Sequence, residues 1–92
     1  MSVLIDTSVW IDHFRNRNDV LVDLIELDLA LAHPMVIVEI ACGTPPGLGC
    51  GLVDISLLAS TLITPGAELW TLDKRLAELA ERFGVAHLPT LH

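Results

Sequence analysis

Residues 2–8 are SVLIDTS, a short apolar run followed by an acid and two hydroxyl side chains. The run predicts a strand over residues 2–5, because β-branched and aliphatic side chains suit the pleated surface of a sheet. Aspartate is favoured immediately before a helix, where its carboxylate accepts hydrogen bonds from free backbone N–H groups. We therefore predict that the strand ends at Asp6 and that a helix follows over residues 7–14.

The alternation of strand and helix continues along the chain. Apolar periodicity and turn residues predict helices over residues 18–28, 35–42, 52–63 and 73–83, and strands over residues 29–32, 68–72 and 85–88. The helix over 52–63 is apolar on nearly every side, so we expect it to be buried. Strands that alternate with helices favour a parallel sheet. We therefore predict a single α/β domain over residues 1–92, with a short parallel sheet of about four strands.

Composition limits the possible functions. The chain has 92 residues, 52% of them apolar, and a net charge of −7 from 12 acids and five bases. A protein that bound nucleic acid by phosphate neutralisation alone would be basic. Either nucleic acid is not a ligand, or carboxylates hold cations that meet the phosphates.

Other features of the sequence concern its cellular compartment. No apolar run approaches the ~18–20 residues of a membrane span, and the N-terminus lacks the basic segment of a signal peptide. Cys42 and Cys50 have neither CxxC spacing nor a secretory context, so we expect reduced, structural thiols. We expect a cytoplasmic protein with no membrane association.

Four of the acids occupy unusual positions. Asp6 and Asp73 each end a strand and open a helix, so each could be a helix cap, a site residue or both. Glu39 lies in the otherwise apolar segment 35–41, where an unpaired buried carboxylate would be costly. A metal ion is a natural partner for it; the alternative is a helix edge that reaches the surface there. Asp54, in the first turn of an apolar helix, could serve the helix dipole or be a second buried acid.

These four acids could converge at one edge of the sheet. Such a cluster would repel itself unless divalent cations neutralised it. Oxygen ligands alone select hard ions, Mg²⁺ or Mn²⁺, over Zn²⁺. A carboxylate site for these ions suits phosphodiester hydrolysis, in which the ions bind the phosphate, activate a water and stabilise the leaving oxygen.

Four segments resemble the motifs of PIN-domain nucleases, in the same order. VLIDTSVW at 3–10 resembles their opening strand and first acid, and VEIA at 38–41 resembles the second acidic position. GLVD at 51–54 with the following Leu57, Leu58 and Ala59 resembles the third, and LWTLDKRL at 69–76 the fourth. The resemblance implies a PIN-like three-layer sandwich of helices around the sheet. Within the family, the chain is most similar to the toxin half of VapBC toxin–antitoxin modules.

The resemblance also implies an activity and partners. It implies a Mg²⁺- or Mn²⁺-dependent endoribonuclease that cuts structured RNA such as tRNA or ribosomal RNA, a cognate VapB-type antitoxin, and a homodimer or higher oligomer. By carry-over of the motifs, the metal-binding and catalytic acids are Asp6, Glu39, Asp54 and Asp73. Thr7 or Ser8 would supply a supporting hydroxyl, with Thr71 a weaker candidate for the same role.

The segment between Glu39 and Asp54 departs from the family pattern. It has only 14 residues, where family members have several dozen that include a helical hairpin. Residues 43–49 contain three glycines and two prolines and cannot form a regular element. Either the chain carries an internal deletion near residues 43–51, which we favour, or residues are missing from the sequence at this point. A deletion would remove part of the substrate groove and the dimer surface but leave the acids in place.

Two other functions are compatible with parts of this sequence. A shortened, non-catalytic PIN protein would bind an antitoxin or a sister subunit and cleave nothing. A phosphoryl-transfer receiver or phosphatase domain also uses aspartates at strand ends. The second is disfavoured, because a phosphatase would need an acid where Ser8 stands and a receiver would need adjacent acids after its first strand.

Overall fold

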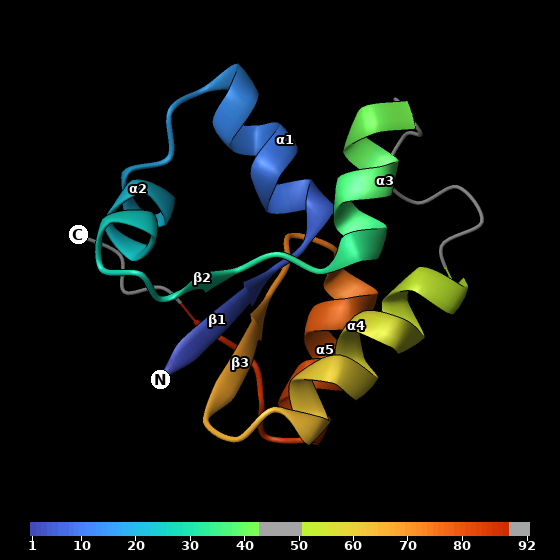
Figure 1. Ribbon diagram of the computed structural model, residues 1–92. Coiled ribbons are helices and arrows are strands. Elements are labelled where there is room, and N and C mark those ends of the chain that lie inside the picture. Colours follow the sequence, from blue (N-terminus) through green and yellow to red (C-terminus); the bar gives the residue numbers. More distant parts are fainter. Residues whose placement is uncertain (43–50, 89–92) are drawn as a thin grey trace.

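The computed structural model describes residues 1–42 and 51–88 of the chain. The junction over 43–50, with Cys50, and the side chain of Cys42 lie outside the described part, so the expectations for them stay predictions. Figure 1 shows the elements in chain order. They are β1 (Ser2–Ile5), α1 (Thr7–Arg15), α2 (Asp19–Glu26), β2 (Ala30–Leu31), α3 (Pro34–Cys42), α4 (Gly51–Ile63), β3 (Ala67–Trp70) and α5 (Lys74–Arg82).

The sheet is parallel, with β1 at its centre. Over the described residues it has three strands in the order β2-β1-β3, and the pairing places Leu4 opposite Leu69 and Ile5 opposite Trp70. The expected α/β class and parallel sheet are confirmed.

The fourth strand, expected over 85–88, is reduced to a single bridge between Leu69 and Ala86. It is held by two hydrogen bonds, from the Leu69 N–H to the Val85 carbonyl (2.7 Å) and from the His87 N–H to the Leu69 carbonyl (2.9 Å). The pairing involves too few residues to extend into a ladder of the kind that β1 and β3 share.

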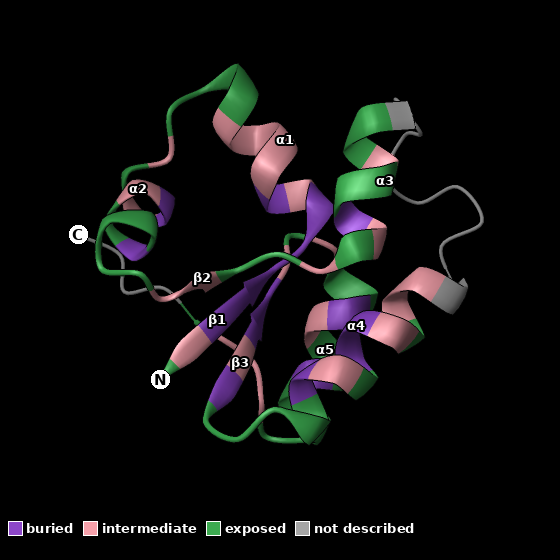
Figure 2. Cartoon of the chain, in the orientation of Figure 1, coloured by how far each residue is buried: buried purple, intermediate pink, exposed green. Residues whose placement is uncertain are grey.

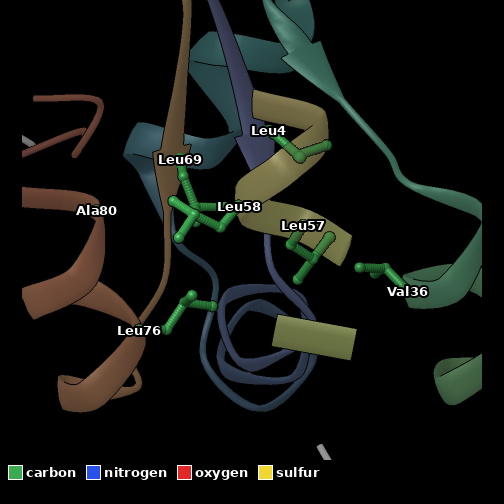
Figure 3. Packing of buried hydrophobic residues seen from close by; sticks show 7 residues of the cluster. All are labelled: Leu4, Val36, Leu57, Leu58, Leu69, Leu76 and Ala80. Atoms are coloured by element: carbon green, nitrogen blue, oxygen red, sulfur yellow. The ribbon is translucent and has the colours of Figure 1, made fainter. Parts of the chain in front are cut away.

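Helices cover both faces of the sheet, because successive strand side chains point to opposite sides. On one face, Val3, Ile5 and Trp70 pack against buried residues of α1 and α2. On the other, Leu4 and Leu69 pack against α3, α4 and α5, and Figure 3 shows this second cluster from close by. Its other members are Val36, Leu57, Leu58, Leu76 and Ala80. The three-layer sandwich expected for a PIN-like domain is confirmed, and Figure 2 shows the buried residues of β1 and β3 between the helical layers.

The ends of two helices require left-handed backbone. Gly84, with φ of 71°, follows α5, and Asp28, with φ of 59°, follows α2. In each case the next N–H bonds a carbonyl of the last turn at 2.9 Å: Val85 to Ala80, and Leu29 to Leu24. This is the Schellman arrangement, for which glycine is the usual residue. Gly84 fits that rule and Asp28 does not, so the end of α2 carries a backbone conformation that costs stability.

The expectation that the helix over 52–63 is buried on nearly every side is wrong. In α4, Leu57, Leu58 and Thr61 are buried, but Ile55 is 65% exposed and Ile63 is 81% exposed. A helix that packs on one face of a sheet has only one side to bury, and on α4 this side carries Leu57 and Leu58, which pack with Leu69 of β3 and Leu76 of α5. Exposed apolar residues also occur on α3, so both helices that flank the junction present such residues to solvent: Ile37, Val38, Ile40, Ile55, Leu62 and Ile63. None of the described helices is long and apolar enough to cross a membrane.

Candidate active site

The candidate site lies where β1 and β3 end. Ile5 and Trp70 are the last paired residues of these strands, and the Asp6 N–H then donates to the Trp70 carbonyl at 2.9 Å. Asp6 and Thr71 therefore leave the sheet side by side at its carboxyl edge. In open α/β sheets this edge is where binding sites collect.

Asp6 is a buried carboxylate, only 7% exposed. Its Oδ2 atom accepts hydrogen bonds from the Ser8 hydroxyl (2.7 Å), the Thr71 hydroxyl (2.8 Å) and the Ser8 N–H (3.4 Å). The last of these makes Asp6 the N-cap of α1. Hydroxyl bonds to a carboxylate are among the stronger hydrogen bonds in proteins, and they offset the cost of burying the charge. Asp6 is therefore both the N-cap of α1 and a candidate site residue.

The two hydroxyls also tie the loop after β3 to Asp6. The Ser8 oxygen accepts the Leu72 N–H at 2.9 Å, and the Thr71 oxygen accepts the Asp73 N–H at 3.0 Å. Each hydroxyl has one proton, and in this arrangement both protons go to Asp6. The 3.3 Å contact between the Ser8 and Thr71 oxygens is therefore a close approach rather than a third bond. The network links the ends of both strands through a single carboxylate oxygen.

Asp73 caps α5, as its position before the helix predicts. Its Oδ1 atom accepts the Arg75 N–H at 2.8 Å and the Leu76 N–H at 3.4 Å. The backbone of Asp73 is held by Thr71, which also holds the carboxylate of Asp6. The structure therefore connects the first and fourth acidic positions through one threonine.

Glu39 is connected to the first acidic position from α3. Thr7, which is 2% exposed and follows Asp6, donates its hydroxyl to Oε1 of Glu39 at 3.0 Å. Helices α1 and α3 are in contact, and Figure 1 shows them side by side. Glu39 is half-buried and its neighbours Val38 and Ile40 are exposed, so it lies at a helix edge rather than inside the core. The Thr7 hydroxyl is therefore one hydrogen-bond partner of the half-buried Glu39 carboxylate.

Asp54 lies in the first turn of α4 and is half-buried. Helix α4 packs against β3 and α5, the two elements on either side of Thr71 and Asp73. That Asp54 joins the other acids stays a prediction. Among the described residues, no group of three or more Asp, Glu, His or Cys side chains is arranged so that it could hold a metal ion. The contacts that connect Asp6, Glu39 and Asp73 run through hydroxyl and backbone groups.

From the sequence, Thr7 and Ser8 are equivalent candidates for the supporting hydroxyl, and Thr71 is a weaker one. The structure separates the three: Ser8 and Thr71 both bond Asp6, and Thr7 bonds Glu39. Thr71 could have been ranked higher, because the register of two parallel strands that end in Ile5 and Trp70 places it beside Asp6. A further residue at this edge was overlooked. His33 accepts the Met35 N–H on Nδ1 at 3.0 Å and caps α3 ahead of Pro34.

Hydroxyl and backbone N–H groups hold Asp6, Glu39 and Asp73 at this edge. Arg17 pairs with Asp19 and His87 with Glu68, and neither of these two ion pairs includes Asp6, Glu39 or Asp73. The groups that could bind a cation are carboxylate and hydroxyl oxygens. Such donors fit a hard divalent ion such as Mg²⁺ or Mn²⁺ and do not fit a soft one.

Two curated relatives of the chain are both named Ribonuclease VapC32 and come from Mycobacterium tuberculosis, strains CDC 1551 / Oshkosh and ATCC 25618 / H37Rv. Each is 35% identical over 117 residues, a match that covers 91% of this chain and 94% of the relative. The chain belongs to the VapC ribonuclease family. This confirms the family that the four acidic motifs resemble, and the PIN domain is implied by the name. No family model and no solved structure matches the sequence.

This VapC chain is shorter than the relatives it matches. The matched 91% of its 92 residues is about 84 residues, whereas the alignment runs over 117, so about 33 aligned positions have no counterpart in this chain. A shortfall of that size agrees with the several dozen residues that the family pattern leads us to expect between Glu39 and Asp54. That the absent positions lie between Glu39 and Asp54 is still a prediction from the sequence.

Proposed function

We propose that this VapC chain is a toxin endoribonuclease that hydrolyses RNA phosphodiester bonds with Mg²⁺ or Mn²⁺ held by Asp6, Glu39, Asp54 and Asp73. The observation that supports this proposal most strongly is the burial of the Asp6 carboxylate together with its hydrogen bonds. It is buried at the carboxyl edge of the sheet, and one of its oxygens is held by the hydroxyls of Ser8 and Thr71. A carboxylate so held is a preorganised ligand, because its supporting hydrogen bonds fix its orientation before an ion arrives.

The role of each residue follows from its contacts. Over the described residues, the hydrogen bonds of Asp6 and Glu39 each engage one carboxylate oxygen, which leaves Oδ1 of Asp6 and Oε2 of Glu39 for a cation. Asp73 likewise uses Oδ1 to cap α5. We assign Ser8, Thr71 and Thr7 as positioning residues, since each holds an acid. Bound Mg²⁺ or Mn²⁺ would supply an activated water and neutralise the charge on the scissile phosphate.

The partners we propose are a cognate VapB-type antitoxin, an RNA such as tRNA or ribosomal RNA, and a second copy of the chain. The exposed apolar residues on α3 and α4 support an association surface, because soluble monomers rarely leave contiguous apolar patches uncovered. Ile37, Val38, Ile55 and Ile63 are each more than half exposed. In the longer relative, the additional residues would be available to cover such a surface.

The competing proposal is a shortened VapC protein that binds an antitoxin or a sister subunit without cleaving RNA. The observation that favours it is the roughly 33 aligned positions absent from this chain. Loss of part of a substrate groove would abolish turnover and leave the acids and their hydrogen bonds unchanged. Binding of metal ions alone would therefore not distinguish the two proposals.

RNA cleavage separates them. Purified chain is incubated with total tRNA and with ribosomal RNA in the presence of Mn²⁺, Mg²⁺ or a chelator, and new 5′ ends are mapped. We expect cleavage that the chelator stops and that Asp6→Asn abolishes, whereas Asp23→Asn, an exposed acid on α2, retains it. Asparagine can still accept the hydrogen bonds of the cap, so Asp6→Asn should keep the fold. No cleavage of either RNA by a folded wild-type chain would favour the non-catalytic protein.

A further inference from the structure

An RNA substrate poses an electrostatic problem for this chain. Its net charge is −7, and the five bases that could oppose this charge are Arg15, Arg17, Lys74, Arg75 and Arg82. Affinity for a polyanion depends strongly on how many phosphates meet a positive charge. The positions of these few bases relative to the acids at the sheet edge therefore decide where a phosphate backbone can lie.

Two of the five bases stand directly beside the site. Lys74 and Arg75 are the first two residues of α5 and follow Asp73, the cap of that helix. Both are exposed, and within the described part of the chain neither takes part in an ion pair. Arg17, in contrast, is paired with Asp19 at 2.9 Å. Arg82 is at the other end of α5, eight residues or about 12 Å of helix away from Lys74.

The position of Lys74 and Arg75 is unfavourable for the helix itself. The N-terminal end of a helix carries partial positive charge, so acids stabilise it and bases destabilise it. The first turn of α5 contains two bases and no acid, whereas Arg82 stands in the last turn, where a base is favourable. Local departures from such preferences are expected where a function requires them. Here the two bases place positive charge next to an acidic site, where a polyanionic substrate would need it.

We propose that Lys74 and Arg75 bind backbone phosphates of the RNA next to the scissile bond. This inference rests on the proposed ribonuclease function and names the residues that align the substrate. The guanidinium of Arg75 can bond one phosphate with two parallel N–H groups, and the Lys74 ammonium acts as a point charge on a neighbouring one. The phosphates carry no base identity, so these contacts position the strand without selecting its sequence.

The salt dependence of RNA binding tests the proposal. A labelled single-stranded RNA is titrated with the full chain carrying Asp6→Asn, which prevents cleavage, between about 50 and 200 mM salt. Each lost phosphate contact lowers the slope of log K against log salt by about 0.7 for a single strand. We expect Lys74→Gln with Arg75→Gln to lower the slope by about 1.4. Arg15→Gln with Arg82→Gln removes the same total charge elsewhere and should leave the slope nearly unchanged.

The possible outcomes are distinct. Equal slopes for the two double variants would show that only net charge matters and would overturn the proposal. The melting temperature of the Lys74→Gln, Arg75→Gln variant should equal or exceed that of the parent, because two bases leave the positive end of α5, so loss of folding does not explain a weaker slope. Cleavage of RNA by the wild-type chain with Mn²⁺ is measured in parallel. Cleavage with equal slopes would refute this inference alone, and no cleavage would refute the proposed function.

Discussion

The hydroxyl of Thr71 lies 2.8 Å from Oδ2 of Asp6, although the two residues are 65 positions apart in the chain. The same hydroxyl accepts the N–H of Asp73 at 3.0 Å. One threonine thus joins the ends of β1 and β3, orients a buried carboxylate and positions the loop that leads into α5. The stability of the fold and the geometry of the candidate site depend here on the same hydrogen bonds.

Replacement of Thr71 tests this double role. Thr71→Val keeps the shape but removes the donor to Asp6 and the acceptor for Asp73, and we expect the free energy of unfolding to fall by about 1–3 kcal/mol. Thr71→Ser keeps the hydroxyl and serves as the matched control, with a loss of less than about 1 kcal/mol for the deleted methyl group. Urea denaturation measures both. A Thr71→Val variant with the unfolding free energy of the wild type would mean that the hydroxyl bonds do not hold the ends of β1 and β3 together.

Divalent ions should stabilise the chain. Carboxylates brought together without a cation repel, and an ion bound only by the folded state raises stability by mass action. At a free ion concentration ten times the dissociation constant, the gain is about 1.4 kcal/mol, or roughly 6–11 °C in melting temperature for a domain of this size.

Thermal unfolding with and without millimolar Mn²⁺ or Mg²⁺ measures this gain. Asp54→Asn should blunt the rise, and Asp23→Asn should leave it intact. A melting temperature indifferent to both ions would indicate that the acids act as caps and surface groups.

The left-handed residue at the end of α2 offers a stabilising substitution. Asp28 has φ of 59°, a conformation that costs an L-residue roughly 1–2 kcal/mol and glycine almost nothing. We expect Asp28→Gly to raise the free energy of unfolding by about 1 kcal/mol. Asp23→Gly, in the interior of the same helix, should lower it by roughly 0.3 kcal/mol, because glycine is slightly less favourable than aspartate in a helix. Denaturant unfolding of the pair checks the sign at each position, and a loss of stability in Asp28→Gly would contradict the assignment of that backbone conformation.

The exposed side of α4 should drive self-association. Ile55 is 65% exposed on a helix beside the junction, and Phe14, 63% exposed on α1, provides a matched apolar residue elsewhere. We expect light scattering to show a dimer or larger oligomer for a chain whose mass matches 92 residues, and Ile55→Glu to shift it toward monomer. Phe14→Glu should have no such effect. A clean, soluble wild-type monomer would rule out this association surface.

Features set by neighbouring residues in the chain could be predicted from the sequence. The strand that ends at Asp6, the caps supplied by Asp6 and Asp73, and the turn at Gly84 all depend on contacts within a few residues, and the structure contains each of them. The parallel sheet followed from the order of the elements. The distinct roles of Thr7 and Ser8 could not be assigned, because they depend on which helix and which strand end lie beside each hydroxyl.

The burial of α4 was mispredicted for a related reason. An apolar helix is buried only as far as other elements cover it, and its sequence alone does not say how many do. Leu57 and Ile55 are both aliphatic, yet Leu57 is fully buried against the sheet and Ile55 is 65% exposed. Likewise the segment around Ala86 has the apolar character of a strand but too few pairing residues to form one.

We propose that acids from four separate elements form one metal site, and calorimetric titration with Mn²⁺ tests this most directly. The wild-type chain is compared with Asp6→Asn, Glu39→Gln, Asp54→Asn and Asp73→Asn, and with Asp23→Asn as control. Asparagine still caps a helix, so loss of a cap does not explain a weaker isotherm for Asp6 or Asp73. We predict that each of the four substitutions weakens binding by about tenfold or more, roughly 1.4 kcal/mol, and that the control binds like the wild type. Wild-type affinity in Glu39→Gln or Asp54→Asn would contradict the shared site.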